Sequence, residues 1–151
     1  MLVSQTVEYA LRAVLQIARD PDGAPVRVGD IAEALDVPRN YLSKTLHRLA
    51  RAGILTSARG PTGGFQLTTA PEDLTLAEIA APFVAVGQRT CLLGQPACGD
   101  DRPCAAHSRW KLVTQQAEDF FSQTTIADLL AHGKIPEASV ASPRRRAGAV
   151  P

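Results

Sequence analysis

The sequence lacks any long apolar run. Although 45% of the 151 residues are hydrophobic, no stretch approaches the roughly 20 apolar residues that a membrane-spanning helix needs. The N-terminus also lacks the basic start and apolar run of a secretory signal, and it carries Glu8 within an amphipathic segment instead. We therefore expect a cytoplasmic protein with a compact core and no membrane partner.

Signatures of common catalytic sites are missing as well. The chain has no Gly-rich phosphate loop, no carboxylate pair and no oxyanion-hole signature, so an enzyme that uses Cys98 or Cys104 with His107 is only a remote alternative. Cysteine is scarce, since all three cysteines lie within 14 residues. An odd number in a reducing compartment favours metal or redox chemistry over a disulfide framework.

Acidic residues are absent from residues 39–71, which contain five arginine or lysine residues. The net charge of the whole chain is only +1, so it conceals a local basic surface. Local charge governs contact with phosphate. This part of the chain is therefore a candidate for binding nucleic acid.

The basic segment follows a helix-turn-helix pattern. Apolar residues recur at helical spacing over residues 28–35 and again, as a leucine stripe, over residues 42–49. Pro38 suits the first position of the second helix, and Gly53 suits its end. Two strand-like segments, residues 54–57 and 65–68, then flank a Gly-rich turn.

Together these elements predict a winged helix-turn-helix that binds DNA. The start of the second helix would enter the major groove, and Arg59 at the tip of the hairpin would enter the minor groove. An interaction-only protein with a solvated hairpin is the alternative, and it would lack salt-dependent affinity for DNA. The candidate DNA-binding residues are Arg39, Asn40, Tyr41, Ser43, Lys44, His47, Arg59, Gly60, Pro61 and Thr62.

Helical elements are predicted on both sides of this motif. A first helix over residues 4–19 should pack behind the helical pair. Capping sequences at Thr75 and Thr125 begin two short helices, and Pro82 should kink or end the first of these. A longer helix is predicted from Pro103 to about residue 122, and the chain is thus mainly α.

We expect three regions. They are a winged helix-turn-helix domain (1–72), a cysteine loop with dimerisation helices (73–135) and a disordered tail (136–151). The long helix has an apolar side that a second subunit would cover, because two-fold homodimers match palindromic operators in double-stranded DNA. The alternative is that this helix folds back on its own winged domain.

The cysteines and a nearby histidine form the pattern Cys91-x6-Cys98-x5-Cys104-x2-His107. Thiolates and an imidazole suit zinc or an iron–sulfur cluster. The pattern lacks the paired CxxC hooks of common zinc sites. From the residues alone, a cluster, a single zinc ion and a metal-free thiol switch all stay open.

The chain resembles the Rrf-two superfamily of bacterial regulators, which includes the IscR and NsrR types, over residues 1 to about 132. The resemblance is carried by QTVEYALRAV, PRNYLSKTLHRLARAGIL, RGPTGG followed by an aromatic residue, LTLAEI, the three cysteines and TTIADLL. It implies a dimeric winged-helix repressor or activator. It further implies an iron–sulfur cluster near the dimer interface that senses redox state, nitric oxide or iron–sulfur status.

By position, Cys91, Cys98 and Cys104 match the three cluster cysteines of this superfamily. His107 matches the histidine of IscR-like [2Fe-2S] members, whereas Glu8 lies where NsrR-like members place an aspartate from the partner subunit for a [4Fe-4S] cluster. The resemblance therefore implies either cluster type. The first gap between cysteines is six residues here, where familiar members have five.

Overall fold

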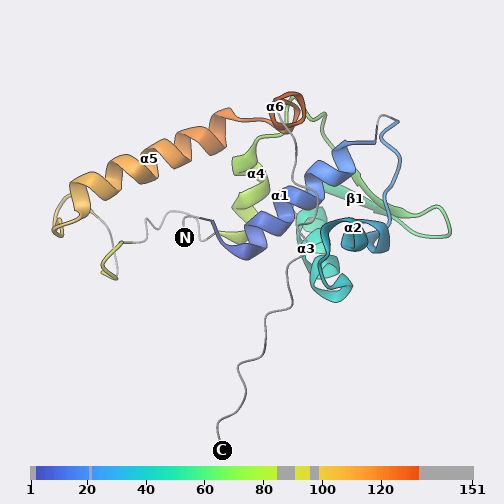
Figure 1. Cartoon of the computed structure of the whole chain (residues 1–151), viewed down its shortest axis with the longest axis horizontal. Coiled ribbons are helices and arrows are strands. Elements are labelled where there is room, and N and C mark those ends of the chain that lie inside the picture. The colour runs from blue at the N-terminus through green and yellow to red at the C-terminus, as the bar shows by residue number, and fades with distance from the viewer. Residues whose placement is uncertain (1–2, 21, 85–90, 96–98, 133–151) are drawn as a thin grey trace, which may run out of the picture.

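The computed structural model describes residues 3–20, 22–84, 91–95 and 99–132 (Figure 1). The elements in chain order are α1 (Gln5–Ala18), α2 (Val28–Leu35), α3 (Arg39–Arg51), β1 (Leu55–Ala58), β2 (Gly64–Leu67), α4 (Leu76–Ala80), the 3-10 helix η1 (Ala81–Phe83), α5 (His107–Gln123) and α6 (Ile126–Ala131). The winged helix-turn-helix prediction is confirmed. No helix within the described ranges is long and apolar enough to cross a membrane.

Helix α1 lies at the centre of the fold. Its first turn is capped by Ser4, whose hydroxyl accepts a hydrogen bond from the Val7 N–H at 3.3 Å. Ala10 and Ala13 are fully buried, and such small side chains allow neighbouring elements to approach closely. Helices α2, α3, α4 and α6 and strand β2 all pack against α1, so the helix predicted over residues 4–19 does support the helical pair.

Helices α2 and α3 form the predicted helix-turn-helix. The turn depends on Asp36, which adopts a left-handed conformation with φ of 51°. The stripe on α3, namely Leu42, Leu46 and Leu49, is fully buried. Burying each such side chain contributes on the order of 1.5–3 kcal/mol, so this stripe firmly anchors α3 against the core.

The ends of α3 agree with the sequence to within one residue. Pro38 precedes the helix as its N-cap rather than occupying the first helical position, because its ψ of 124° is extended. Its carbonyl oxygen still accepts the first helical hydrogen bond, from the Leu42 N–H at 3.1 Å. Gly53, with φ of 79°, follows the last turn as predicted.

Strands β1 and β2 form an antiparallel hairpin in which Leu55 pairs with Leu67. Each strand is displaced by one residue from its predicted bounds. The bounds follow the register of the hairpin, in which Ala58 pairs with Gly64. Val26, which precedes α2, adds a contact that local sequence does not reveal, because it exchanges two backbone hydrogen bonds with Phe65, at 2.9 and 2.8 Å.

The first turns of α4 and α6 are paired with each other. Both predicted capping boxes are present, Thr75 with Glu78 and Thr125 with Asp128. The backbones before the two helices form an antiparallel bridge, in which the Leu76 N–H donates to the Thr124 oxygen at 3.0 Å. The Ile126 N–H donates to the Leu74 oxygen at 2.9 Å. This pairing fixes the C-terminal end of α5 beside α4.

Helix α5 begins at His107, four residues later than predicted. Residues 105 and 106 form a turn instead, closed by a hydrogen bond from the His107 N–H to the Cys104 oxygen at 3.0 Å. Cys104 packs toward Cys91, and this tertiary contact prevails over the preference of Pro103 for a first helical turn. The 17 residues of α5 span about 25 Å.

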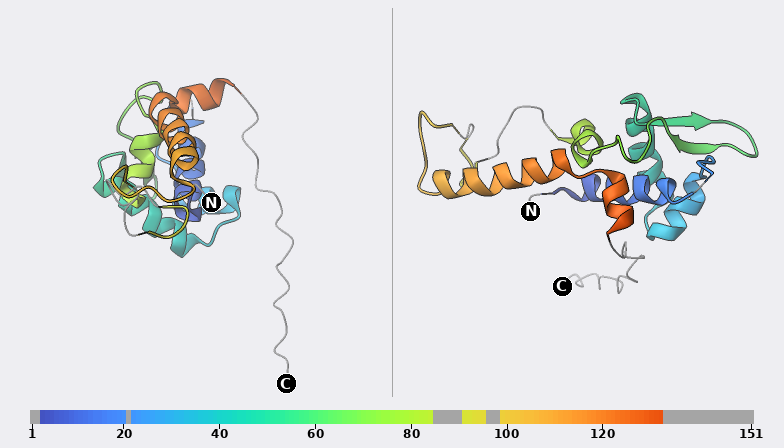
Figure 2. Two further views of the ribbon diagram at one scale, coloured as in Figure 1. Left: turned by 90° about the vertical axis from the view of Figure 1, so that its left-hand side faces the viewer. Right: turned by 90° about the horizontal axis from the view of Figure 1, so that it is seen from above.

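Most of α5 projects away from the winged domain, at the opposite end of the molecule from the hairpin (Figure 2). Only His107 is buried along this helix. Leu112 is 67% exposed and Phe120 is 53% exposed. The predicted apolar side is thus only partly covered by the described part of its own chain: Phe121 packs against the core, whereas Val113 and Phe120 are exposed. The predicted tail (136–151) and Gly133 lie outside the described residues.

The close approach of Gly64 to Val26 yields a stability prediction. A Cβ atom at position 64 would lie 2.4 Å from the Val26 carbonyl oxygen. The Gly64→Ala variant should therefore lower the free energy of unfolding by about 1–3 kcal/mol through overpacking, measured by urea denaturation.

Gly29→Ala is the matched control, because nothing lies within 4 Å of a Cβ atom at that helical position. Its stability should stay the same or increase by up to about 1 kcal/mol. Equal stability of Gly64→Ala and the original protein would show that the wing does not pack closely against Val26.

Candidate functional site

The exposed face of α3 is basic and slightly concave. Its concavity, about 610 Å³ in volume, is lined by Ser43, Lys44, His47, Arg48 and Arg51. Arg39 and Asn40, at the start of the helix, are exposed as well. A helix with short polar side chains at its N-terminus and cations behind them matches the shape and charge of the DNA major groove.

Tyr41 has a structural role that the sequence did not reveal. Its ring packs edge-to-face on Tyr9 with centroids 5.6 Å apart, and its hydroxyl hydrogen-bonds to that of Thr6. Both partners belong to α1. With 39% of the residue still exposed, Tyr41 anchors the start of α3 and leaves only part of its surface for another contact.

Two contacts fix the hairpin, one to α3 and one to the residue before α2. The ring of His47 lies edge-to-face on Phe65, with centroids 5.3 Å apart. Arg27, which precedes α2, donates a hydrogen bond to the carbonyl oxygen of Pro61 at the tip. Sequence reasoning missed both Arg27 and Phe65, because neither shows a local pattern that indicates its distant partner.

The predicted tip residues are all exposed, namely Arg59, Gly60, Pro61 and Thr62. Gly60 has φ of 103° and its carbonyl accepts from the Gly63 N–H at 3.0 Å, which makes the turn. The structure thus places the basic helix face and Arg59 of the hairpin tip on one packed unit. Arg48 instead links α3 to η1, with its guanidinium 5.1 Å from the centre of the Phe83 ring.

The second candidate site lies at the far end of α5. Cys91 is buried and Cys104 is half-buried, and their sulfur atoms are 3.8 Å apart. The two sulfurs are not joined in a disulfide. Cys98 falls outside the described residues. Within the described ranges no set of three or more His, Cys, Asp and Glu side chains is arranged to hold a metal ion.

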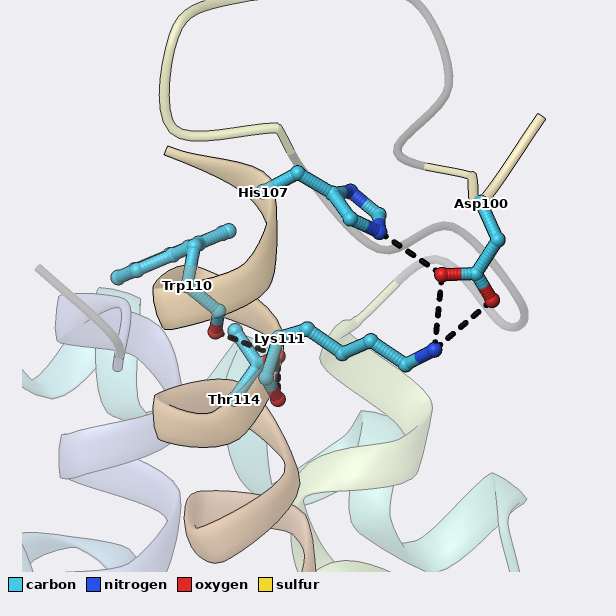
Figure 3. A network of polar contacts seen from close by, with 5 residues as sticks. All are labelled: Asp100, His107, Trp110, Lys111 and Thr114. Carbon is cyan, nitrogen blue, oxygen red and sulfur yellow. Dashed lines mark hydrogen bonds and ion pairs between the residues drawn. The ribbon is translucent and has the colours of Figure 1, made fainter. Parts of the chain in front are cut away.

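His107 lies one turn beyond Cys104 and is only 7% exposed. Its Nε2 atom lies 2.9 Å from Oδ1 of Asp100, and the Lys111 ammonium donates to both oxygens of that carboxylate at 2.8 Å (Figure 3). The hydrogen bonds from Lys111 and then from His107 lower the pKa of Asp100 to about 2. Asp100 is therefore an ionised hydrogen-bond acceptor at neutral pH.

Glu8, the other candidate for a fourth ligand, is on the exposed side of α1. Its carboxylate pairs with Arg12 of the same helix at 3.5 Å. An exposed pair of this kind contributes little to stability. The described contacts of Glu8 join it to its own helix and not to either described cysteine.

Comparison with known proteins identifies the family. Residues 3–132 match Rrf2, described as an iron-dependent transcriptional regulator. The chain belongs to the Rrf2 family. This confirms the resemblance to the Rrf-two superfamily that was drawn from the motifs.

Individual Rrf2-type relatives agree with this assignment. An HTH-type transcriptional regulator of Aquifex aeolicus is 38% identical over 133 residues, which cover 86% of this chain and 92% of the relative. The structure of T. potens IscR is 25% identical, with a TM-score of 0.69 and 85% of each chain covered. The chain is accordingly a DNA-binding transcriptional regulator and not an enzyme.

The fold is also similar to that of a regulator that is not called IscR. The structure of CymR, the global cysteine regulator of B. subtilis, has a TM-score of 0.72, covers 87% of this chain and 98% of that protein, and is 22% identical. At this identity the match shows the fold alone. Membership of the Rrf2 family thus establishes the winged helix and the regulatory role, and it leaves the sensed signal to be argued from the cysteines.

The exposed position of Arg59 yields a prediction about DNA binding. The Arg59→Ala variant should bind a duplex selected from a random pool more weakly, because a phosphate or minor-groove contact is lost. The slope of log K against log salt concentration should become shallower by about 0.9. Fluorescence anisotropy over a range of salt concentrations measures both quantities.

The control is Arg109→Ala, which removes an exposed arginine of α5. Since this helix projects away from the winged domain, both the affinity and the slope should be unchanged. If Arg59→Ala and Arg109→Ala behave alike, the hairpin tip does not contact DNA.

Proposed function

We propose that this regulator controls its affinity for a palindromic operator through an iron–sulfur cluster held by Cys91, Cys98, Cys104 and His107. The 3.8 Å separation of the Cys91 and Cys104 sulfurs carries the proposal. Cys91 and Cys104 are two of the four ligands that the proposed cluster needs. The proposal otherwise draws on the family description, which is that of an iron-dependent regulator.

The distance between the two sulfurs fits binding to one metal ion. A tetrahedral ion with metal–sulfur bonds of 2.3 Å holds its sulfurs about 3.8 Å apart. Tetrahedral sulfur ligation is shared by zinc and by the irons of iron–sulfur clusters. Thiolates and an imidazole on one short segment therefore suit either, and iron is favoured by the family.

The same distance supports a [2Fe-2S] cluster over a [4Fe-4S] cluster. Each iron of a two-iron cluster takes two protein ligands, whereas each iron of a four-iron cluster takes one. Two sulfurs spaced for a single iron therefore favour the smaller cluster. In this assignment Cys91 and Cys104 would hold one iron, and Cys98 and His107 would supply the two remaining ligands.

The position of His107 supports it as the fourth ligand. Its ring is buried beside the turn that carries Cys104, to which its backbone is hydrogen-bonded. Glu8 is engaged with Arg12 on an exposed face. A partner subunit's Glu8 at a [4Fe-4S] cluster remains the alternative ligand set.

When bound, the cluster supplies a centre that reacts with oxidants and nitric oxide and that is lost when iron is scarce. A change in ligation of the cluster would move the helix that follows the cysteines. Cys104 lies three residues before the start of α5, and the other end of α5 is fixed to α4 by the paired capping segments. Release of Cys104 would therefore alter the position of α5 relative to α4.

Helix α3 also contacts the segment that precedes the cysteines in the chain. Phe83 of η1 lies eight residues before Cys91, and its ring packs under the guanidinium of Arg48 on α3. Operator half-sites lie about one helical turn apart, so small changes in the spacing of two recognition helices alter affinity.

The exposed side of α5 supports a homodimer. Leu112, Val113 and Phe120 are exposed apolar residues on a helix that projects from the winged domain. A second copy of α5 would cover them, and two-fold symmetry would present two winged domains to a palindrome. In that arrangement the start of α3 reads the major groove, with the candidate contacts Arg39, Asn40, Tyr41, Ser43, Lys44 and His47.

A metal-free thiol switch is the second candidate, and the same pair of sulfurs favours it. The thiols of Cys91 and Cys104 are unlinked and 3.8 Å apart. A peroxide could accept their two electrons and two protons as the disulfide forms, so that hydrogen peroxide yields two water molecules and an organic hydroperoxide yields an alcohol and water. This switch would need neither iron nor sulfide.

The experiment that separates these candidates is an absorption spectrum of protein purified without oxygen. Iron and acid-labile sulfide are assayed on the same sample. We expect visible absorbance with about two irons and two sulfides per subunit. Cys91→Ala, Cys104→Ala and His107→Ala should each lower this content, whereas His132→Ala, at the end of α6, should not.

Colourless protein after reconstitution with iron and sulfide would contradict the cluster. Bound zinc in that sample would then indicate a single-metal site. A metal-free sample that forms a disulfide between Cys91 and Cys104 on addition of peroxide would indicate the thiol switch instead.

A further inference from the structure

The carboxylate of Asp100 connects the cysteine loop to the first turns of α5. It accepts hydrogen bonds from His107 and Lys111, which are four residues apart and lie on one face of the helix (Figure 3). The side chain of Asp100 is 73% exposed, whereas that of His107 is only 8% exposed. An exposed group on the loop thus holds a buried ring on the helix.

The hydrogen-bonding chemistry of this contact determines which ring nitrogen carries a proton. An ionised carboxylate accepts hydrogen bonds and cannot donate them. The Nε2 atom of His107, at 2.9 Å from Asp100, must therefore be the N–H group. In a neutral imidazole the lone pair then belongs to Nδ1.

We propose that Asp100 holds His107 in the tautomer protonated at Nε2, so that Nδ1 binds the cluster, and that Lys111 positions Asp100 for this purpose. The proposal rests on the proposed function of the cysteine site. It makes Asp100 and Lys111 positioning residues that act on the cluster through His107. Metal-binding histidines commonly donate their second ring N–H to a carboxylate in this way.

The role of Lys111 follows from the geometry. Its ammonium lies 2.8 Å from each oxygen of Asp100. Both carboxylate oxygens are therefore held by Lys111 while Oδ1 also contacts His107. Without Lys111 the exposed Asp100 side chain would rotate freely into solvent. The Lys111 charge also partly offsets the negative charge that Asp100 brings near the thiolates.

The first test uses the metal-free protein. Long-range ¹H–¹⁵N correlation spectra of ¹⁵N-histidine-labelled protein, recorded at fixed neutral pH, distinguish the two tautomers and the doubly protonated ring. His107→Gln identifies the signals of His107. We expect the pattern of the Nε2–H tautomer, and we expect Asp100→Ala to replace it with a mixture of tautomers. Asp101→Ala, which removes the next carboxylate along the chain, should leave the pattern unchanged.

The second test uses the cluster-loaded protein. Asp100→Asn removes the charge of the acceptor, so the affinity for iron should fall by about 10- to 100-fold. The reduction potential should rise, because a negative charge that disfavours the added electron is gone. Lys111→Met should also weaken iron binding, because Asp100 is no longer held beside His107, and Asp101→Asn should match the original protein.

Several results would overturn the inference. One is a His107 ring protonated at Nδ1, or at both nitrogens, in the unmodified metal-free protein. Another is an equal reduction potential in the Asp100→Asn and Asp101→Asn proteins. Absence of iron and sulfide from the unmodified protein would overturn the proposed function itself. A wrong tautomer in protein that does contain both would overturn only the role of Asp100.

Discussion

The antiparallel pairing of the N-termini of α4 and α6 is the constraint on which the rest of the structure depends. It separates the winged domain, at one end of the molecule, from the cysteine site at the other (Figure 2). Residues on either side of Thr75 and Thr125 exchange backbone hydrogen bonds, and each threonine then caps its own helix. Every helix start leaves N–H groups without helical partners, and here the bridge and the capping boxes satisfy several of them together. Leu74, Leu76 and Ile126 are buried around the bridge, so it is also shielded from competing water.

This constraint determines how the rest of the chain can communicate. Because the bridge holds the C-terminal end of α5 beside α4, the other end of α5 projects and carries the cysteine site away from the hairpin (Figure 2). Helix α4 packs on α1 and α1 packs on α3. A displacement at Cys104 therefore has a continuous path of packed helices to the exposed basic face of α3.

Local patterns predicted most elements because their determinants are local. The leucine stripe of α3, the turn after it at Gly53 and both capping boxes are set by residues within a few positions of each other. The errors occurred where a distant residue decides. Val26 pairs with Phe65 of β2, Cys104 lies against Cys91 just before α5, and Arg27 reaches Pro61 across 34 residues. Similarly, the cysteine spacing indicated a site, but only the fold reveals Asp100 as the partner of His107.

The central claim is that the cysteine site controls DNA affinity through α5 and α4. The most direct measurement compares cluster-loaded and cluster-free protein binding to one duplex, selected from a random pool, at the same salt concentration. The account predicts affinities that differ by about 5- to 150-fold, the usual range for coupled sites. It also predicts that the Glu78→Ala variant, which breaks the capping box beside the bridge, reduces this difference. Equal affinities of the loaded and cluster-free proteins would contradict the claim.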